Sequence, residues 1–234
     1  MMSDERFFTA YATFSECYKV GAKINGLPQG IIIHSTAAKN PHLKRYVKDV
    51  KRCGVNPYNN YMGSEVAAKA GNTTTPHAVA GLDINGEFAI AQILPYNMCC
   101  YGCAGTGNKT HIQIEICEDY ENSKQYCYNI LQMVAKWCAE LCEQYKIDID
   151  DIVSHKEAHA LGIASNHGDP EHWISAHGYT MDNFRDWVRE WARLPAVTYS
   201  IQLGAFAVRE NAEKFLKTVQ VDFPDAFIKI NTSR

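Results

Sequence analysis

The 234-residue chain lacks several features that would point to particular classes of protein. It has no apolar run near the roughly 20 residues that a membrane-spanning helix needs. It has no basic excess, with 23 Lys and Arg against 26 Asp and Glu, which argues against nucleic acid as a partner. The first ten residues carry acidic side chains and no apolar segment, so we expect a chain made in the cytoplasm without a signal peptide. It also lacks a His-Glu-x-x-His helix, which disfavours a zinc peptidase of that type.

Cysteine, in contrast, is abundant, with nine residues. A cytoplasmic origin predicts reduced thiols rather than disulfides. Four cysteines fall in a predicted strand or helix and are interpreted as small buried apolar side chains: Cys117, Cys127, Cys138 and Cys142. Three lie together in a loop: Cys99, Cys100 and Cys103. Their single Cys-x-x-Cys is weak support for a second metal site, because no second pair follows at zinc spacing.

The apolar pattern predicts an α/β fold with a central mixed sheet flanked by helices. Strands are predicted at 31–35, 77–82, 87–94, 111–117 and 151–154, and helices at about 40–50, 123–145 and 180–191. The Asn85-Gly86 pair predicts a hairpin between the second and third strands. Residues 53–75 and 154–173 are interpreted as loops, and the structure of residues 7–20 is left open.

Two distant segments concentrate the polar chemistry. His34 ends a short apolar strand, and by itself it is more simply explained as a buried core histidine. The loop at 154–173 carries an unusual number of metal-binding side chains: His155, His159, His167, Asp169 and His172. Three such side chains can converge in space on a zinc ion and leave the fourth position to water. Composition does not say which of them bind.

Three separated motifs, in this order, carry a resemblance to a known family. They are Ile-Ile-Ile-His-Ser-Thr at 31–36, Ile-Gln-Ile-Glu-Ile-Cys at 112–117, and Ser-His-Lys-Glu-Ala-His followed by Asn-His-Gly-Asp-Pro within 154–170. Together they resemble the zinc-dependent N-acetylmuramoyl-L-alanine amidases (Amidase_2), whose fold is shared by phage lysins and peptidoglycan-recognition proteins. The likeness covers roughly residues 10–192 and implies a catalytic domain at 1–194.

The resemblance assigns a role to each motif residue. It implies that His34, His155 and Asp169 hold Zn²⁺ and that Glu115 acts as the catalytic proton carrier. His167 stands where many relatives have a lysine that stabilises the oxyanion, so its catalytic role is a hypothesis.

Other residues are candidates for lining the substrate cleft. For His77, at a strand start, a structural role and a substrate contact are equally supported. Tyr61, Tyr96 and Tyr101 are predicted loop aromatics that can flank a long, shallow cleft.

Residues 199–234, after a linker at 195–198, resemble half of a SPOR peptidoglycan-binding repeat. The pattern predicts a strand at 199–206, a helix at 209–219 and a strand at 226–230. The sequence stops before the remaining elements of that repeat. Three alternatives stay open: the segment docks on the amidase, two chains complete one domain as a homodimer, or the gene is truncated.

The expected function is therefore zinc-dependent hydrolysis of the amide between N-acetylmuramic acid and L-alanine in bacterial peptidoglycan. A phage or prophage endolysin, which acts on the cell wall after release, fits the predicted lack of a signal peptide. The alternative is a protein of the same fold that binds peptidoglycan without cutting it. Such proteins typically lack a metal ligand, and the presence of all three ligands with Glu115 favours the enzyme.

Overall fold

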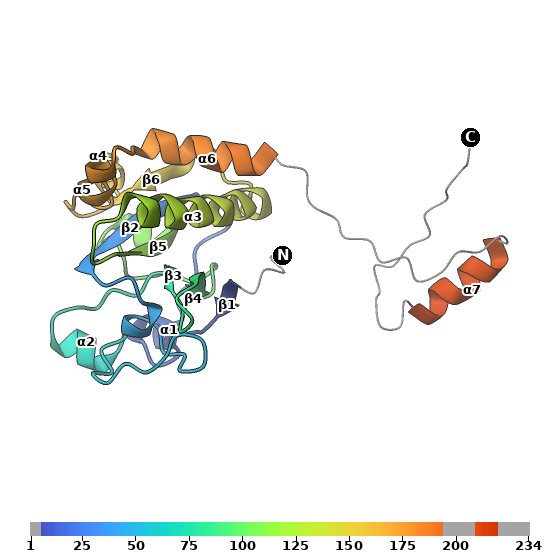
Figure 1. Cartoon of the computed structure of the whole chain (residues 1–234), viewed down its shortest axis with the longest axis horizontal. Helices are drawn as coiled ribbons and strands as arrows, with labels where there is room; N and C mark the ends of the chain where they lie inside the picture. The colour runs from blue at the N-terminus through green and yellow to red at the C-terminus, as the bar shows by residue number, and fades with distance from the viewer. Residues whose placement is uncertain (1–5, 194–208, 220–234) are drawn as a thin grey trace. The chain divides into compact units, whose positions relative to one another are not determined.

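The computed structural model describes residues 6–193 and 209–219. The chain divides into two compact units, Met1–Leu194 and Pro195–Arg234 (Figure 1). In the described part of the chain, no helix is both long and apolar enough to cross a membrane.

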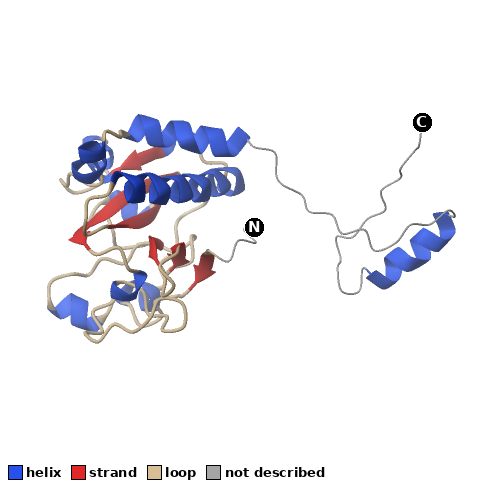
Figure 2. Ribbon diagram, viewed as in Figure 1, coloured by secondary structure: helices blue, strands red, loops and turns tan. Residues whose placement is uncertain are grey.

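The first unit is built on one six-stranded mixed sheet (Figure 2). Its strands are β1 Phe7–Thr9, β2 Gly30–Lys39, β3 Ala78–Leu82, β4 Phe88–Gln92, β5 His111–Glu118 and β6 Ile152–Ser154. They lie in the order β1-β4-β3-β5-β2-β6. Only the β3–β4 hairpin is antiparallel among these pairs. The predicted fold class and the Asn-Gly hairpin are confirmed.

The central strands are apolar because both faces of the sheet are covered. On one face, α3 Lys124–Tyr145 and α6 Met181–Arg193 lie side by side (Figure 1). Their side chains, including Val134 and Phe184, share one buried cluster with Ile33 and Ile114. The predicted helices at 123–145 and 180–191 are confirmed, and the Ser123 side chain caps α3 by accepting from a backbone N–H.

The opposite face is covered by the segment that follows β2, and here the prediction of a helix at 40–50 is wrong. The segment forms only a short 3-10 helix, η1 Leu43–Arg45. The Asn40 side chain accepts from the His42 N–H, making a turn. The Pro41 carbonyl accepts from the Leu82 N–H at 2.7 Å. Because these backbone groups pair with a turn and with β3, they are not available to a helix.

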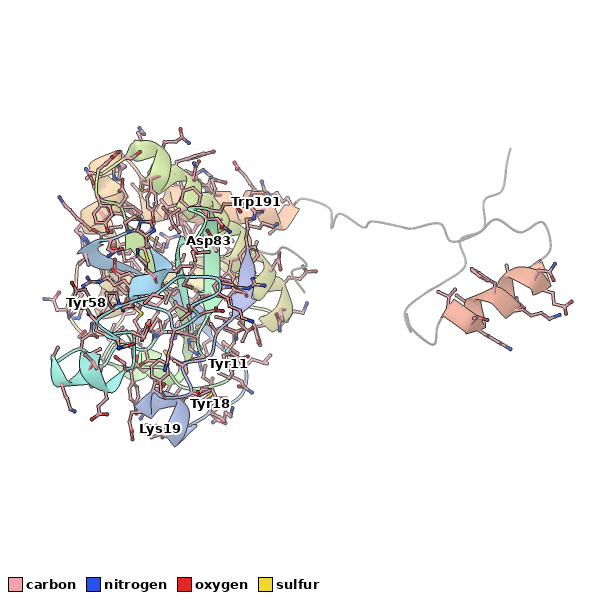
Figure 3. The ribbon with its side chains drawn as sticks, turned by 60° about the horizontal axis from the view of Figure 1, so that its bottom comes forward. Tyr11, Tyr18, Lys19, Tyr58, Asp83 and Trp191 are labelled. Atoms are coloured by element: carbon pink, nitrogen blue, oxygen red, sulfur yellow. The ribbon has the colours of Figure 1, made fainter. Side chains whose placement is uncertain are left out.

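Short helices also occur where loops were predicted or structure was left open. They are α1 Glu16–Val20, α2 Glu65–Lys69, η2 Thr106–Lys109, η3 Ile149–Asp151, α4 His155–Ala160, α5 Glu171–Ile174 and η4 Ser175–His177. Near α1, the rings of Tyr11 and Tyr18 pack with their centroids 6.1 Å apart (Figure 3). The polar segment at 154–173 is therefore not a continuous loop, since α4 and α5 lie within it.

The second unit contains α7 Arg209–Val219, which confirms the predicted helix at 209–219. The linker at 195–198 and the predicted strands at 199–206 and 226–230 lie outside the described residues. The resemblance of this segment to a SPOR repeat stays a prediction.

Candidate metal centre

Three side chains from distant parts of the chain converge at one end of the sheet. They are His34 on β2, His155 on α4 and Asp169 just before α5, and their ligand atoms all lie within 4.8 Å of one another. His34 Nδ1 is 3.0 Å from His155 Nδ1 and 3.1 Å from Asp169 Oδ2. His155 Nδ1 is 3.4 Å from Asp169 Oδ1. The structure thus brings together the three residues that the resemblance assigned to zinc.

The sheet explains how two of them meet. β2 and β6 run parallel, with Ile33 opposite Ser154. His34 is the next residue on β2 and His155 directly follows β6, so the two histidines lie at the same end of this pairing. Because β2 continues to Lys39, the prediction that His34 ends its strand is wrong. Ser154 then starts α4 with a capping box, in which its side chain accepts from the Glu157 N–H and the Glu157 carboxylate accepts from the Ser154 N–H. This cap fixes His155 as the first residue of the helix.

The charge state of Asp169 suits a ligand. Burial alone would raise the pKa of its carboxyl, but hydrogen bonding and charge from His155 and His34 outweigh burial and hold that pKa well below its usual range. Asp169 is therefore ionised at neutral pH.

The arrangement fits a bound cation. Both imidazoles point Nδ1 toward the shared centre and Nε2 away from it, where His34 Nε2 meets Gln113 and His155 Nε2 meets Ser165. The two Nδ1 atoms, 3.0 Å apart beside a carboxylate, face a common point that a cation can occupy. Two neutral imidazoles and one carboxylate are a donor set typical of catalytic zinc. In the described part of the chain, the loop cysteines Cys99, Cys100 and Cys103 form no comparable cluster.

Glu115 lies beside this centre. It occupies the position on β5 directly opposite His34 on β2. Its side chain is buried, and its Oε2 atom has no hydrogen-bond partner in the described structure. Burial raises the pKa of Glu115 to about 8, and the negative charges of Asp169 and Glu118 add to this effect. A buried carboxyl that titrates near neutral pH is suited to carrying a proton.

His167 lies on the outer side of the centre. Its exposed ring stacks on the ring of His155, with centroids 4.8 Å apart and planes at 25°. The structure therefore places His167 next to a predicted ligand and within reach of solvent.

The remaining candidates are dispersed. His77 is fully buried, its Nε2 donates to the Met98 carbonyl and its Nδ1 accepts from a backbone N–H, so the structure supports the structural alternative. Tyr61 is 4% exposed and contacts Phe14, which leaves little of its ring for a substrate. Tyr96 packs against α3, where its hydroxyl accepts from the Trp137 indole. Tyr101 is 38% exposed and stays a candidate for substrate contact.

Sequence reasoning gave no role to two residues that contact the ligands. Gln113 is fully buried beside His34, and Ser165 contacts His155. For Gln113 a signal was present, because it shares a face of its strand with Glu115 two residues later. For Ser165 the sequence contains no such signal, since a serine in a polar segment is usually solvated.

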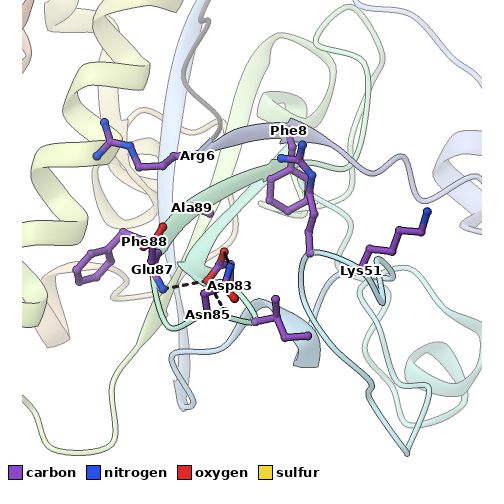
Figure 4. Close-up of a pocket in the computed structure, with 10 residues that line it drawn as sticks. Arg6, Phe8, Lys51, Asp83, Asn85, Glu87, Phe88 and Ala89 are labelled. Atoms are coloured by element: carbon purple, nitrogen blue, oxygen red, sulfur yellow. Dashed lines mark hydrogen bonds between the residues drawn. The ribbon is translucent and has the colours of Figure 1, made fainter.

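A shallow pocket of about 200 Å³ lies elsewhere, at the β3–β4 hairpin (Figure 4). Its lining mixes charged and aromatic residues, including Arg6, Phe8, Lys51 and Asp83. None of the residues of the metal centre line it, so it is separate from the candidate site.

The family Amidase_2, described as N-acetylmuramoyl-L-alanine amidase, matches residues 25–172. This range contains all three converging ligands together with Glu115 and His167. No curated protein matched the chain in a sequence search.

Solved structures are similar in fold. The Staphylococcus aureus hydrolase AmiA, solved in complex with its ligand, has a TM-score of 0.56 at 18% identity, covering 82% of this chain and 85% of AmiA. The PlyG catalytic domain has a TM-score of 0.54 at 18% identity, covering 82% of this chain and 99% of that domain. A mutant endolysin from Bacillus subtilis has a TM-score of 0.50 at 17% identity, covering 78% and 97%.

Proposed function

The chain belongs to the Amidase_2 family of N-acetylmuramoyl-L-alanine amidases, and from this premise we propose that it is a zinc-dependent peptidoglycan amidase. The bond cleaved is the amide between the lactyl group of N-acetylmuramic acid and L-alanine of the stem peptide. The observation that carries the proposal is the convergence of His34, His155 and Asp169 within 4.8 Å, with Glu115 beside them.

His34, His155 and Asp169 would hold the metal through two Nδ1 atoms and a carboxylate oxygen. When bound, Zn²⁺ supplies a Lewis acid and lowers the pKa of a coordinated water to about 7. The protein contributes the geometry: the parallel β2 and β6 strands fix both histidines at one edge of the sheet. The ionised Asp169 contributes the negative charge that holds the two imidazoles in place.

Glu115 is the proposed proton carrier. Its Oε2 atom is buried without a hydrogen-bond partner in the described structure, so it is available to a water at the centre. As a carboxylate it accepts a proton from the attacking water, and as a carboxylic acid it then returns that proton to the departing amine. A pKa raised by burial favours this exchange, because neither form is held too tightly.

His167 is proposed to assist from the solvent side. Its ring stacks on His155, so it is held near the position where negative charge develops on the carbonyl oxygen. A donor at that position stabilises the transition state more than the substrate. Tyr101 is exposed on the loop after β4 and is the remaining proposed substrate contact.

The biological setting proposed is that of an endolysin acting on the bacterial cell wall. The fold likeness to a mutant endolysin from Bacillus subtilis supports this setting, as does family membership. Peptidoglycan is accordingly the proposed partner.

The decisive experiment incubates the purified full-length chain with peptidoglycan and with soluble muropeptides, with and without a chelator. We expect stem peptides with a free L-alanine amine, identified by mass spectrometry, and their loss on chelation with recovery when Zn²⁺ is added. New reducing sugar ends would contradict the amidase. Binding to peptidoglycan with no release at all would instead support the non-catalytic alternative.

A further inference from the structure

We infer that Asn108, acting through Gln113, is a positioning residue that sets the tautomer of His34 and thereby the metal affinity of the site. The inference rests on the proposed zinc site. It assigns a task to two residues that are not themselves ligands. Its basis is a chain of hydrogen bonds that begins at two backbone amides and ends at the imidazole.

The first link joins Gln113 to the ligand. His34 Nε2 lies 2.9 Å from Gln113 Oε1, and both side chains are buried. If the amide oxygen of Gln113 faces the ring, His34 Nε2 must carry the proton and Nδ1 presents its lone pair to the centre. If the amide were reversed, the opposite tautomer would be favoured. The orientation of Gln113 therefore decides which nitrogen is free for a metal.

The second link fixes that orientation. Gln113 Nε2 donates to Asn108 Oδ1 at 3.2 Å and to the Cys103 sulfur at 3.4 Å. A reversed Gln113 would place its oxygen against the oxygen of Asn108. That contact is repulsive, so Asn108 holds Gln113 with its oxygen toward His34.

The third link fixes Asn108 itself. Its Oδ1 accepts from the backbone N–H groups of Gly102 and Cys103, both at 3.0 Å. Backbone amides are donors only, so this atom must be the oxygen. The direction of every later bond follows from these two amides, and the chain ends with a proton on His34 Nε2.

The loop is shaped to bring these groups together. A Cβ built at Gly102 would lie 2.1 Å from Gln113 Oε1 and 3.6 Å from His34 Nε2. Only glycine lets the backbone approach the Gln113 amide this closely.

The second histidine is held by the same loop. His155 Nε2 lies 3.2 Å from Ser165 Oγ, and that hydroxyl donates to the Cys103 carbonyl at 3.1 Å. Because the Ser165 hydroxyl donates its proton to the Cys103 carbonyl, the Ser165 oxygen can only accept a hydrogen bond from His155 Nε2. Both imidazoles are thus directed to keep the proton on Nε2 by groups anchored at Cys103.

The test measures Zn²⁺ affinity by competition with a chromophoric chelator, on the full-length protein. Outer groups of this kind typically change metal affinity 10–100-fold. We expect Asn108→Leu and Gln113→Leu each to weaken Zn²⁺ binding by about 10–100-fold. Asn108→Asp keeps the acceptor oxygen and should restore affinity to within about threefold of wild type.

Two comparisons separate this role from general loop damage. Asp83→Ala removes a carboxylate that, like Asn108, accepts from two loop amides, those of Asn85 and Glu87 (Figure 4). It should leave Zn²⁺ affinity unchanged. If Asn108 acts through Gln113, adding Asn108→Leu to Gln113→Leu should weaken binding by less than about threefold more.

A spectroscopic measurement reads the tautomer directly. Long-range ¹H–¹⁵N correlation spectra of histidine-labelled, zinc-free protein should show a proton on His34 Nε2, and Asn108→Leu should reduce the population that carries it. Wild-type affinity and tautomer in Asn108→Leu, or an Asn108→Asp variant as weak as Asn108→Leu, would overturn the inference. If the wild type binds no zinc, the proposed function fails, while the zinc-free tautomer still decides the role of Asn108.

Discussion

His34 and Glu115 stand directly opposite each other on the neighbouring parallel strands β2 and β5. This register places the predicted metal ligand and the predicted proton carrier side by side, although 80 residues lie between them in the chain. Two separate sequence motifs therefore become one site because the strands that carry them are adjacent.

The first prediction concerns turnover. Glu115→Gln keeps the shape of the side chain but cannot accept a proton, so we expect amide hydrolysis to fall by about 10²–10⁴-fold. Zn²⁺ affinity should remain, since Glu115 is not among the converging ligands. Release of stem peptides and chelator competition measure the two effects. Glu143→Gln, at an exposed position on α3, is the matched control and should retain activity.

The second prediction concerns stability against pH in zinc-free protein. The pKa of Glu115 is raised from 4.5 to about 8, chiefly by burial. Below the lower value the carboxyl is protonated whether folded or unfolded. Between the two values only the folded chain keeps the proton, so wild-type stability should fall as pH rises, relative to Glu115→Gln. Above about pH 8 the difference should level off.

Urea titrations of both proteins across this pH range, in the presence of a chelator, give the free energies of unfolding to compare. All other titrating groups are common to the two proteins and cancel. A difference between them that stays constant with pH would show that burial does not raise the pKa of Glu115.

Periodicity and turn chemistry predicted most of the sheet and its long helices. The Ile31–Ile33 run and the Asn85-Gly86 turn are local signals, and each formed the element it indicates. The helix predicted at about 40–50 did not form, because the Pro41 carbonyl accepts from the Leu82 N–H on β3, a tertiary contact that no local pattern contains.

At the site, too, local patterns were predictable from the sequence and tertiary contacts were not. The number of histidines and carboxylates in 154–173 was visible in the sequence, but the convergence with His34 required the pairing of β6 with β2. The capping box of Ser154 and Glu157 was also visible, as Ser-x-x-Glu, yet the segment was interpreted as a loop. The link from Asn108 to His34 depends on side-chain directions in a folded loop, and no spacing rule encodes it.

The third prediction follows from that cap. Ser154→Ala removes the acceptor for the Glu157 N–H and should lower the free energy of unfolding by about 0.5–2 kcal/mol. Because His155 is the first residue of α4, loss of the cap should also leave the His155 side chain less firmly positioned. Zn²⁺ binding should weaken as a result. Ser123→Ala removes the corresponding cap of α3 and should destabilise the fold without a specific loss of Zn²⁺ affinity. Equal loss of affinity in both variants would contradict this reasoning.

The fourth prediction concerns metal removal. A ligand that binds only the folded state stabilises it by about 2.7 kcal/mol when its free concentration is 100 times Kd. For a chain of this size, each kcal/mol of stabilisation raises the Tm by roughly 2–4 °C. We expect Zn²⁺ to raise the Tm of wild type and a chelator to reverse the change. Asp169→Asn, which removes the charged ligand, should show a much smaller response in the same thermal scans.

The last prediction separates catalysis from metal binding at His167. Its ring is exposed and stacks on His155 without belonging to the converging ligands. If His167 donates to the developing oxyanion, His167→Ala should lower kcat by up to about 100-fold and leave Zn²⁺ affinity unchanged. His167→Lys keeps a donor and should retain most of the activity. His159→Ala, another exposed histidine, on α4, is the matched control, and equal kcat in both alanine variants would remove His167 from the mechanism.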